Sequence, residues 1–150
     1  GNIGLRFPVD LLSFLHDSNL GVTRGMVVCG GGMDEASLLG ENKVCEIRFG
    51  KLTPYAFTPA DLGLPSCTVA DLRGGSPQEN AQITRDVLSG KERGAKRGEI
   101  LLNAGIALYL GIDGIQLSDG IKRAAELTAK YLSFADSSKS LNCFSMKIFA

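Results

Sequence analysis

The chain has 150 residues, of which 44% are hydrophobic, and its 16 basic side chains are balanced by 16 acidic ones. This length allows one domain with its own core. The balanced charge argues against a nucleic-acid or membrane-surface binder, because such proteins carry an excess of Lys and Arg. No apolar run reaches the roughly 18 residues of a membrane helix, and the first residues lack the pattern of a signal peptide. We therefore expect neither nucleic acid nor a membrane as a partner.

The four cysteines, at positions 29, 45, 67 and 143, show no C-x-x-C spacing, and the chain has a single histidine, His16. This pattern argues against a zinc site and favours reduced thiols in a cytoplasmic protein. The chain starts without Met and within a strand-like pattern. We therefore expect a segment of a longer protein.

The first elements have the pattern of a β-α-β unit. Residues 3–5 resemble the end of a strand, a helix follows from about Pro8 to a stop at Gly21, and the Val-rich run 26–29 is a second strand. Strands joined by a helix pair in parallel. The sequence therefore predicts an α/β fold with a partial parallel sheet flanked by helices.

A glycine-rich loop, residues 30–37, follows this strand at once. Three successive glycines are typical of a backbone that turns tightly or lies close to a ligand, and the adjacent acids Asp34 and Glu35 come next. Neighbouring carboxylates repel unless a cation compensates, and Mg²⁺ is held by one or two carboxylates plus substrate phosphates. The alternative is that Asp34 caps a helix and Glu35 is solvated. The glycines match neither the G-x-G-x-x-G pattern nor the P-loop.

The next segment alternates polar and apolar residues. Residues 43–49 and 52–57 flank a turn at Gly50 and predict a β-hairpin, with Pro54 on an edge strand because proline cannot donate to a ladder. Thr58 and Pro59 then predict a short helical turn that stops at Gly63.

A second glycine-marked loop, residues 71–75, precedes a helix that opens at Ser76 with a capping box and stops at Gly90. The basic segment 91–97 predicts a solvated connection. A phosphate contact from Arg73 or from this basic segment remains an alternative.

The last two helices differ in their pattern. Residues 99–110 are apolar almost all round, which predicts a buried helix in which Asn103 must find polar partners. Its small residues would let another helix approach closely. The final helix is capped by Ser118 and carries an apolar stripe with three- and four-residue spacing.

Four motifs of this chain resemble those of anthranilate phosphoribosyltransferases, in the same order. They are Gly-Met-Asp-Glu-Ala-Ser at 32–37, Phe-Thr-Pro-Ala-Asp-Leu-Gly-Leu at 57–64, Asp-Leu-Arg-Gly-Gly-Ser-Pro-Gln-Glu-Asn-Ala at 71–81, and Leu-Asn-Ala-Gly-Ile-Ala-Leu-Tyr at 102–109. The resemblance covers roughly residues 3 to 126. It implies transfer of phosphoribosyl from phosphoribosyl diphosphate to anthranilate, with release of diphosphate, in tryptophan biosynthesis.

The resemblance also implies roles for particular residues. Asp34 and Glu35 would be the Mg²⁺ ligands, and Gly31 and Gly32 would bind substrate. Residues 1–90 would belong to the α/β domain, 91–115 would form a helix of a small helical domain, and 116–150 would be the C-terminal helices. The family's partner is a second copy in a homodimer, and its location is the cytoplasm, or the plastid in a photosynthetic eukaryote.

This chain departs from the family pattern in two ways. It has Cys29 where the family often has His, and it contains neither a Gly-Thr-Gly-Gly nor a Lys-His-Gly-Asn segment. We therefore expect it to supply one wall of an active site and to be inactive alone. Three alternatives remain: a related nucleoside phosphorylase or phosphoribosyltransferase-like protein with another acceptor, a non-catalytic relative that binds nucleic acid, and a truncated remnant.

Overall fold

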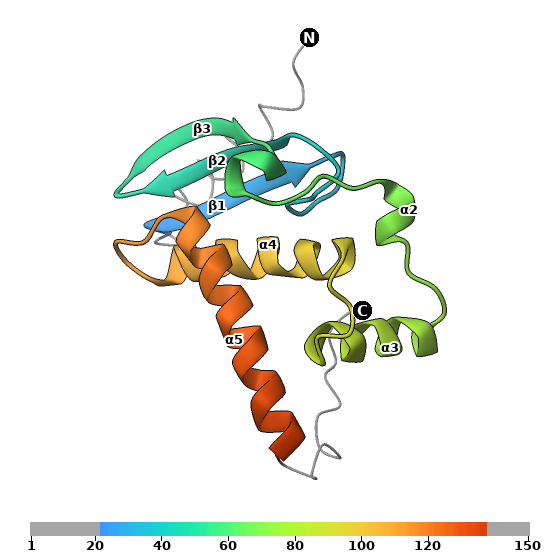
Figure 1. Cartoon of the computed structure of the whole chain (residues 1–150). Helices are drawn as coiled ribbons and strands as arrows, with labels where there is room; N and C mark the ends of the chain where they lie inside the picture. The colour runs from blue at the N-terminus through green and yellow to red at the C-terminus, as the bar shows by residue number, and fades with distance from the viewer. Residues whose placement is uncertain (1–21, 138–150) are drawn as a thin grey trace.

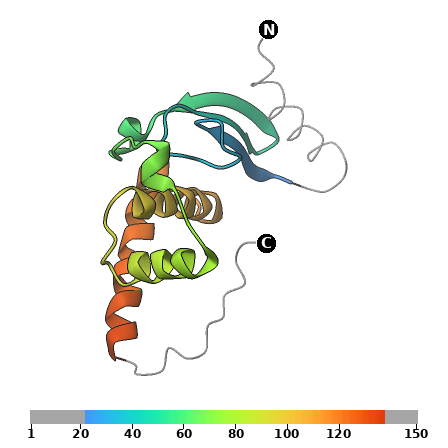
Figure 2. The same ribbon diagram turned by 90° about the vertical axis from the view of Figure 1, so that its right-hand side faces the viewer.

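The computed structural model describes residues 22–137 and places a small sheet over a layer of helices (Figure 1). Figure 2 shows α4 beneath the sheet and α5 running away from it. The fold is α/β, as predicted, although the strand and helix expected before residue 21 lie outside the described residues. The elements are β1 (Arg24–Gly30), β2 (Asn42–Arg48), β3 (Lys51–Phe57), η1 (Pro59–Leu62), α2 (Val69–Leu72), α3 (Pro77–Leu88), α4 (Ala95–Gly111) and α5 (Leu117–Ser137).

The pairing of β1 corrects the prediction of a parallel sheet. The sheet has the order β1-β2-β3, and β1 pairs with β2 antiparallel from Arg24 opposite Arg48 to Gly30 opposite Asn42. The connection between these strands is the loop 31–41, which contains no helix. Parallel neighbours need a crossover of a dozen or more residues, usually helical, so this loop can only return the chain antiparallel.

The predicted hairpin is confirmed. β2 pairs antiparallel with β3. Pro54 lies on β3, which is an edge strand, so on the side without a neighbouring strand its missing N–H costs no hydrogen bond. The two turn residues, Phe49 and Gly50, both have positive φ, at 50° and 75°. These angles are those of a tight turn whose twist matches the flanking strands.

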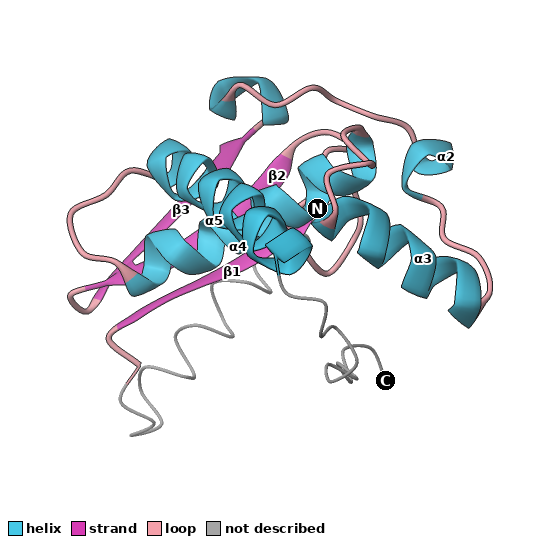
Figure 3. Ribbon diagram, turned by 60° about the horizontal axis from the view of Figure 1, so that its bottom comes forward, coloured by secondary structure: helices cyan, strands magenta, loops and turns pink. Residues whose placement is uncertain are grey.

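The larger of the two described core clusters lies between one face of the sheet and the helices α4 and α5, and the smaller one is formed around Cys45 and Ile47 of β2. Buried side chains from β2 and β3 meet Leu102 and Ile106 of α4 and Ile121 of α5. Figure 3 shows α4 and α5 over this face of the sheet, with α2 and α3 to one side. The expectation that α4 is buried all round is wrong, because Ile100 is 45% exposed on the side that neither the sheet nor α5 covers.

Local signals placed the start of α3 correctly, but Ser118, which was expected to cap the last helix, lies inside α5, which begins at Leu117. Ser76 accepts from the N–H of Glu79 while the Glu79 carboxylate accepts from the N–H of Ser76, as the capping box predicts. α4 begins at Ala95, so the basic segment expected to be a connection ends inside a helix. Among residues 22–137, no helix is long and apolar enough to cross a membrane.

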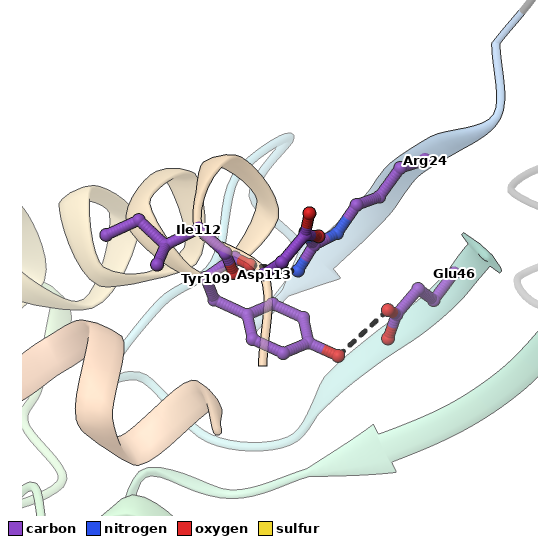
Figure 4. Close-up of polar contacts among 5 residues, drawn as sticks. All are labelled: Arg24, Glu46, Tyr109, Ile112 and Asp113. Carbon is purple, nitrogen blue, oxygen red and sulfur yellow. Dashed lines mark hydrogen bonds and ion pairs between the residues drawn. The ribbon is translucent and has the colours of Figure 1, made fainter. Parts of the chain in front are cut away.

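A buried polar network ties the sheet to the C-terminal end of α4 (Figure 4). Glu46 on β2 is only 7% exposed, and its carboxylate accepts from the hydroxyl of Tyr109 at 2.8 Å and from that of Tyr55 at 3.2 Å. Arg24 on β1 donates to the carbonyls of Tyr109 and Ile112. The arginine thereby satisfies carbonyls at the helix end, where a cation is favoured.

Replacing Tyr109 by Phe should lower the free energy of unfolding by about 1–3 kcal/mol, because one oxygen of a buried carboxylate loses its donor. Tyr55→Phe is the matched control, since its hydroxyl is farther from the same carboxylate and its side chain is less buried. We expect the smaller loss for the control. Thermal unfolding midpoints measure both, and equal losses would contradict the importance assigned to the Tyr109 bond.

Candidate functional site

The loop between β1 and β2 presents the two predicted acids, Asp34 and Glu35, on the surface. A tight turn precedes them: the N–H of Met33 donates to the carbonyl of Gly30 at 2.8 Å, and the N–H of Gly30 donates to the carbonyl of Glu35 at 2.9 Å. No helix begins at Asp34, so the alternative in which it caps a helix is wrong. The two carboxylates therefore belong to consecutive residues of a hydrogen-bonded turn.

The three positions of this turn are occupied by glycine for different physical reasons. A Cβ on Gly30 would lie 2.1 Å from Oδ1 of Asn42 and 2.5 Å from N of Ser37, so Gly30 is required by packing within the protein. Gly31 and Gly32 have φ of 57° and 86°, where only glycine is unstrained. A Cβ on Gly32 would meet no atom of residues 22–137 within 4 Å, so the described residues leave space beside this position.

Asn42, at the start of β2, holds the far side of the loop. Its side chain is fully buried, accepts from the N–H of Ser37 at 2.7 Å, and donates to the carbonyls of Ser37 and Gly40 at 2.9 and 3.1 Å. The side-chain amide of Asn42 therefore supplies the hydrogen bonds that these backbone groups of the loop would otherwise obtain from a neighbouring strand.

Two residues of α4 hold the segment directly after the acids. Asn103 accepts from the N–H of Ala36 at 3.2 Å and donates to its carbonyl at 2.8 Å. Glu99 accepts from the N–H of Leu38 at 2.8 Å. Asn103 was expected to need buried partners, and these bonds identify them.

The electrostatics of the pair favour a bound cation. Partial burial raises the pKa of Glu35, and the charges of Glu99 and Asp34 raise it further. Within residues 22–137 no group of three or more His, Cys, Asp or Glu side chains could hold a metal ion. The chemistry of the two carboxylates in this loop fits a magnesium ion, which is held in proteins by one or two carboxylates together with substrate phosphates and water.

Among the described residues, no hydrogen bond or ion pair joins the other predicted phosphate contacts to this loop. Arg73 is exposed in the loop before α3. Lys96 of the basic segment donates to the carbonyl of Asp71 at 2.7 Å, which joins these two segments to each other. Sequence inspection missed Glu99 and Asn42, and the only available signal was their polar character inside or beside apolar runs.

A family model described as "Glycosyl transferase family, a/b domain" matches residues 15–130, and the chain belongs to this family. Its relatives are, more narrowly, anthranilate phosphoribosyltransferases. The chain is 50% identical over 91 residues to the enzyme of Shewanella amazonensis, and 47% identical over 109 residues to that of Lachnoclostridium phytofermentans, covering 61% and 72% of this chain.

Solved structures give the same relationship. Anthranilate phosphoribosyltransferase from Thermus thermophilus matches 74% of this chain with a TM-score of 0.66 and 39% identity. The Saccharomyces cerevisiae enzyme in complex with PRPP and Mg matches 76% with a TM-score of 0.61 and 27% identity. The chain spans only part of these proteins: 26% and 32% of the two curated relatives, and 32% and 35% of the two solved chains.

Proposed function

We propose that the complete protein containing this chain transfers a phosphoribosyl group from phosphoribosyl diphosphate to anthranilate and releases diphosphate, a step of tryptophan biosynthesis. The observation that carries this proposal is the acidic turn at Asp34 and Glu35 in a chain whose relatives are anthranilate phosphoribosyltransferases. One of the matched structures is in complex with PRPP and Mg, which supports the substrate and the ion.

In this proposal, Asp34 and Glu35 are the Mg²⁺ ligands of the chain. When bound, the ion neutralises the negative charge that develops on the departing diphosphate. The chain's own contribution is to hold the two carboxylates at a fixed place, because the turn before them and the segment after them are both hydrogen-bonded. Such rigidity means that little reorganisation is needed during the reaction.

The remaining parts of the proposal concern the rest of the site. Gly31 and Gly32 would bind substrate through the backbone, and the space beside Gly32 supports this role. Residues 1–90 would be the C-terminal part of the α/β domain, 91–115 a helix of the small helical domain, and 116–150 the C-terminal helices. The protein would act as a cytoplasmic or plastid homodimer.

The test is an assay of the complete protein with anthranilate, phosphoribosyl diphosphate and Mg²⁺. We expect anthranilate fluorescence to fall as product forms, and a chelator of divalent ions to stop the reaction. The 150-residue chain alone should show no turnover, because it would supply one wall of the site. Phosphorolysis of pyrimidine nucleosides without any reaction of anthranilate would contradict the proposed acceptor. Turnover by this chain alone would contradict the proposal that it supplies only one wall of the active site.

A further inference from the structure

We propose that Glu99 and Asn103 of α4 are positioning residues for the acidic turn, which fix the direction in which Asp34 and Glu35 are presented. This inference rests on the proposed function, because it concerns the same ion. Neither side chain has to touch the ion or the substrate.

The side chains of Glu99 and Asn103 both reach from one helix to one short segment of the loop, and we call these two side chains the clamp. Glu99 and Asn103 are four residues apart, so they project from the same side of α4, one turn from each other. Asn103 binds both the N–H and the carbonyl of Ala36, which is the residue directly after Glu35. Glu99 binds the N–H of Leu38. The loop is thus attached to a helix far away in the chain, at 61 and 67 residues of separation.

The bonding of the two side chains indicates a specific role for Glu99. Asn103 also donates to the carbonyl of Glu99 at 3.1 Å, so it is locked to its own helix as well as to the loop. Within the described residues, Oε1 of Glu99 is buried and has no hydrogen-bond partner. An unpaired buried oxygen costs stability, so packing alone does not favour a carboxylate here.

Both hydrogen-bonding side chains act on the backbone that follows the acidic pair, so they orient the pair without supplying a third ligand. Groups that orient metal ligands from behind typically affect metal affinity by about 10- to 100-fold.

The test uses Glu99→Ala, Glu99→Gln and Asn103→Ala in the complete protein. For Glu99→Ala and Asn103→Ala, the Mg²⁺ concentration that gives half-maximal turnover should rise about tenfold, with a lower kcat and a nearly unchanged KM for anthranilate. Glu99→Gln should stay within about threefold of the parent protein, because its amide oxygen can still accept from the N–H of Leu38. A Gln variant as impaired as the Ala variant would overturn positioning by this hydrogen bond.

A stability control and a second readout separate this inference from the proposed function. Val87→Ala removes a buried side chain of α3 that has no part in the loop, and it should lower the unfolding midpoint without changing the Mg²⁺ requirement. Hydrogen–deuterium exchange of the peptide covering residues 33–40 needs no activity. It should accelerate in Glu99→Ala and Asn103→Ala but not in Val87→Ala. Unchanged exchange in the clamp variants would overturn the inference even if the protein is the proposed enzyme, whereas faster exchange in a protein without Mg²⁺-dependent turnover would refute the proposed function alone.

Discussion

Asp34→Asn or Glu35→Gln in the complete protein should each lower Mg²⁺-dependent turnover by about 10²-fold or more, the effect typical of removing one group that stabilises charge in a transition state. Both substitutions keep the size of the side chain and remove only its charge. Both positions are exposed, so the unfolding midpoint of the metal-free protein should change little. Initial rates across a Mg²⁺ titration measure the effect.

The control for this pair is Glu41→Gln, an exposed acid in the same loop. It should retain the turnover and the Mg²⁺ dependence of the parent protein. If Asp34→Asn and Glu35→Gln behaved like Glu41→Gln, the assignment of the acidic turn as the ion site would be wrong.

The raised pKa of Glu35 adds a signed expectation to the same variant. Because the folded-state pKa lies above the ordinary value of 4.5, the folded protein favours protonated Glu35, and that contribution to stability is lost as the pH rises from about 4.5 through the folded pKa. Glu35→Gln should therefore unfold at the same or a slightly higher temperature than the parent at neutral pH without metal. Added Mg²⁺ should stabilise the parent and not the variant.

The largest effect on stability is expected for Gly105→Val, which should cost about 3 kcal/mol or more and lower the soluble yield. Gly105 lies where α4 meets α5, and a Cβ there would stand 2.7 Å from Cα and 2.8 Å from N of Ile121. These are backbone atoms, so the clash is relieved only if α5 moves. Gly120 on the other helix is equally close, since its Cβ would lie 2.3 Å from the carbonyl oxygen of Gly105.

Gly111→Ala is the matched control on the same helix. A Cβ at Gly111 would meet no atom of the described part of the chain within 4 Å, and the φ of Gly111 is not in the left-handed region. Alanine should therefore be neutral or stabilising by up to about 1 kcal/mol. Thermal unfolding compares the two variants, and a Gly105→Val protein with the parent midpoint would show that α5 does not pack against α4 as described.

The features that the sequence revealed are those set by near neighbours in the chain. The hairpin with Pro54 at its edge, the capping box at Ser76 and the need of Asn103 for partners were all predictable, because each depends on residues a few positions apart or on one polar residue in an apolar run. The antiparallel pairing of the strand 26–29 was not predicted, because an apolar run has no direction and the β-α-β interpretation favoured a parallel neighbour. The short loop after the strand decided the pairing.

By itself, the sequence determined that this protein carries adjacent acids on a glycine turn and that it is related to phosphoribosyltransferases. Both conclusions follow from short runs of consecutive residues. Only the tertiary structure decided what holds that turn. Glu99 and Asn103 reach it from α4, and Asn42 reaches it from the next strand. The physical reason is distance along the chain: a helix cap acts within one turn, whereas a clamp across 61 or 67 residues exists only once the helix has packed against the sheet.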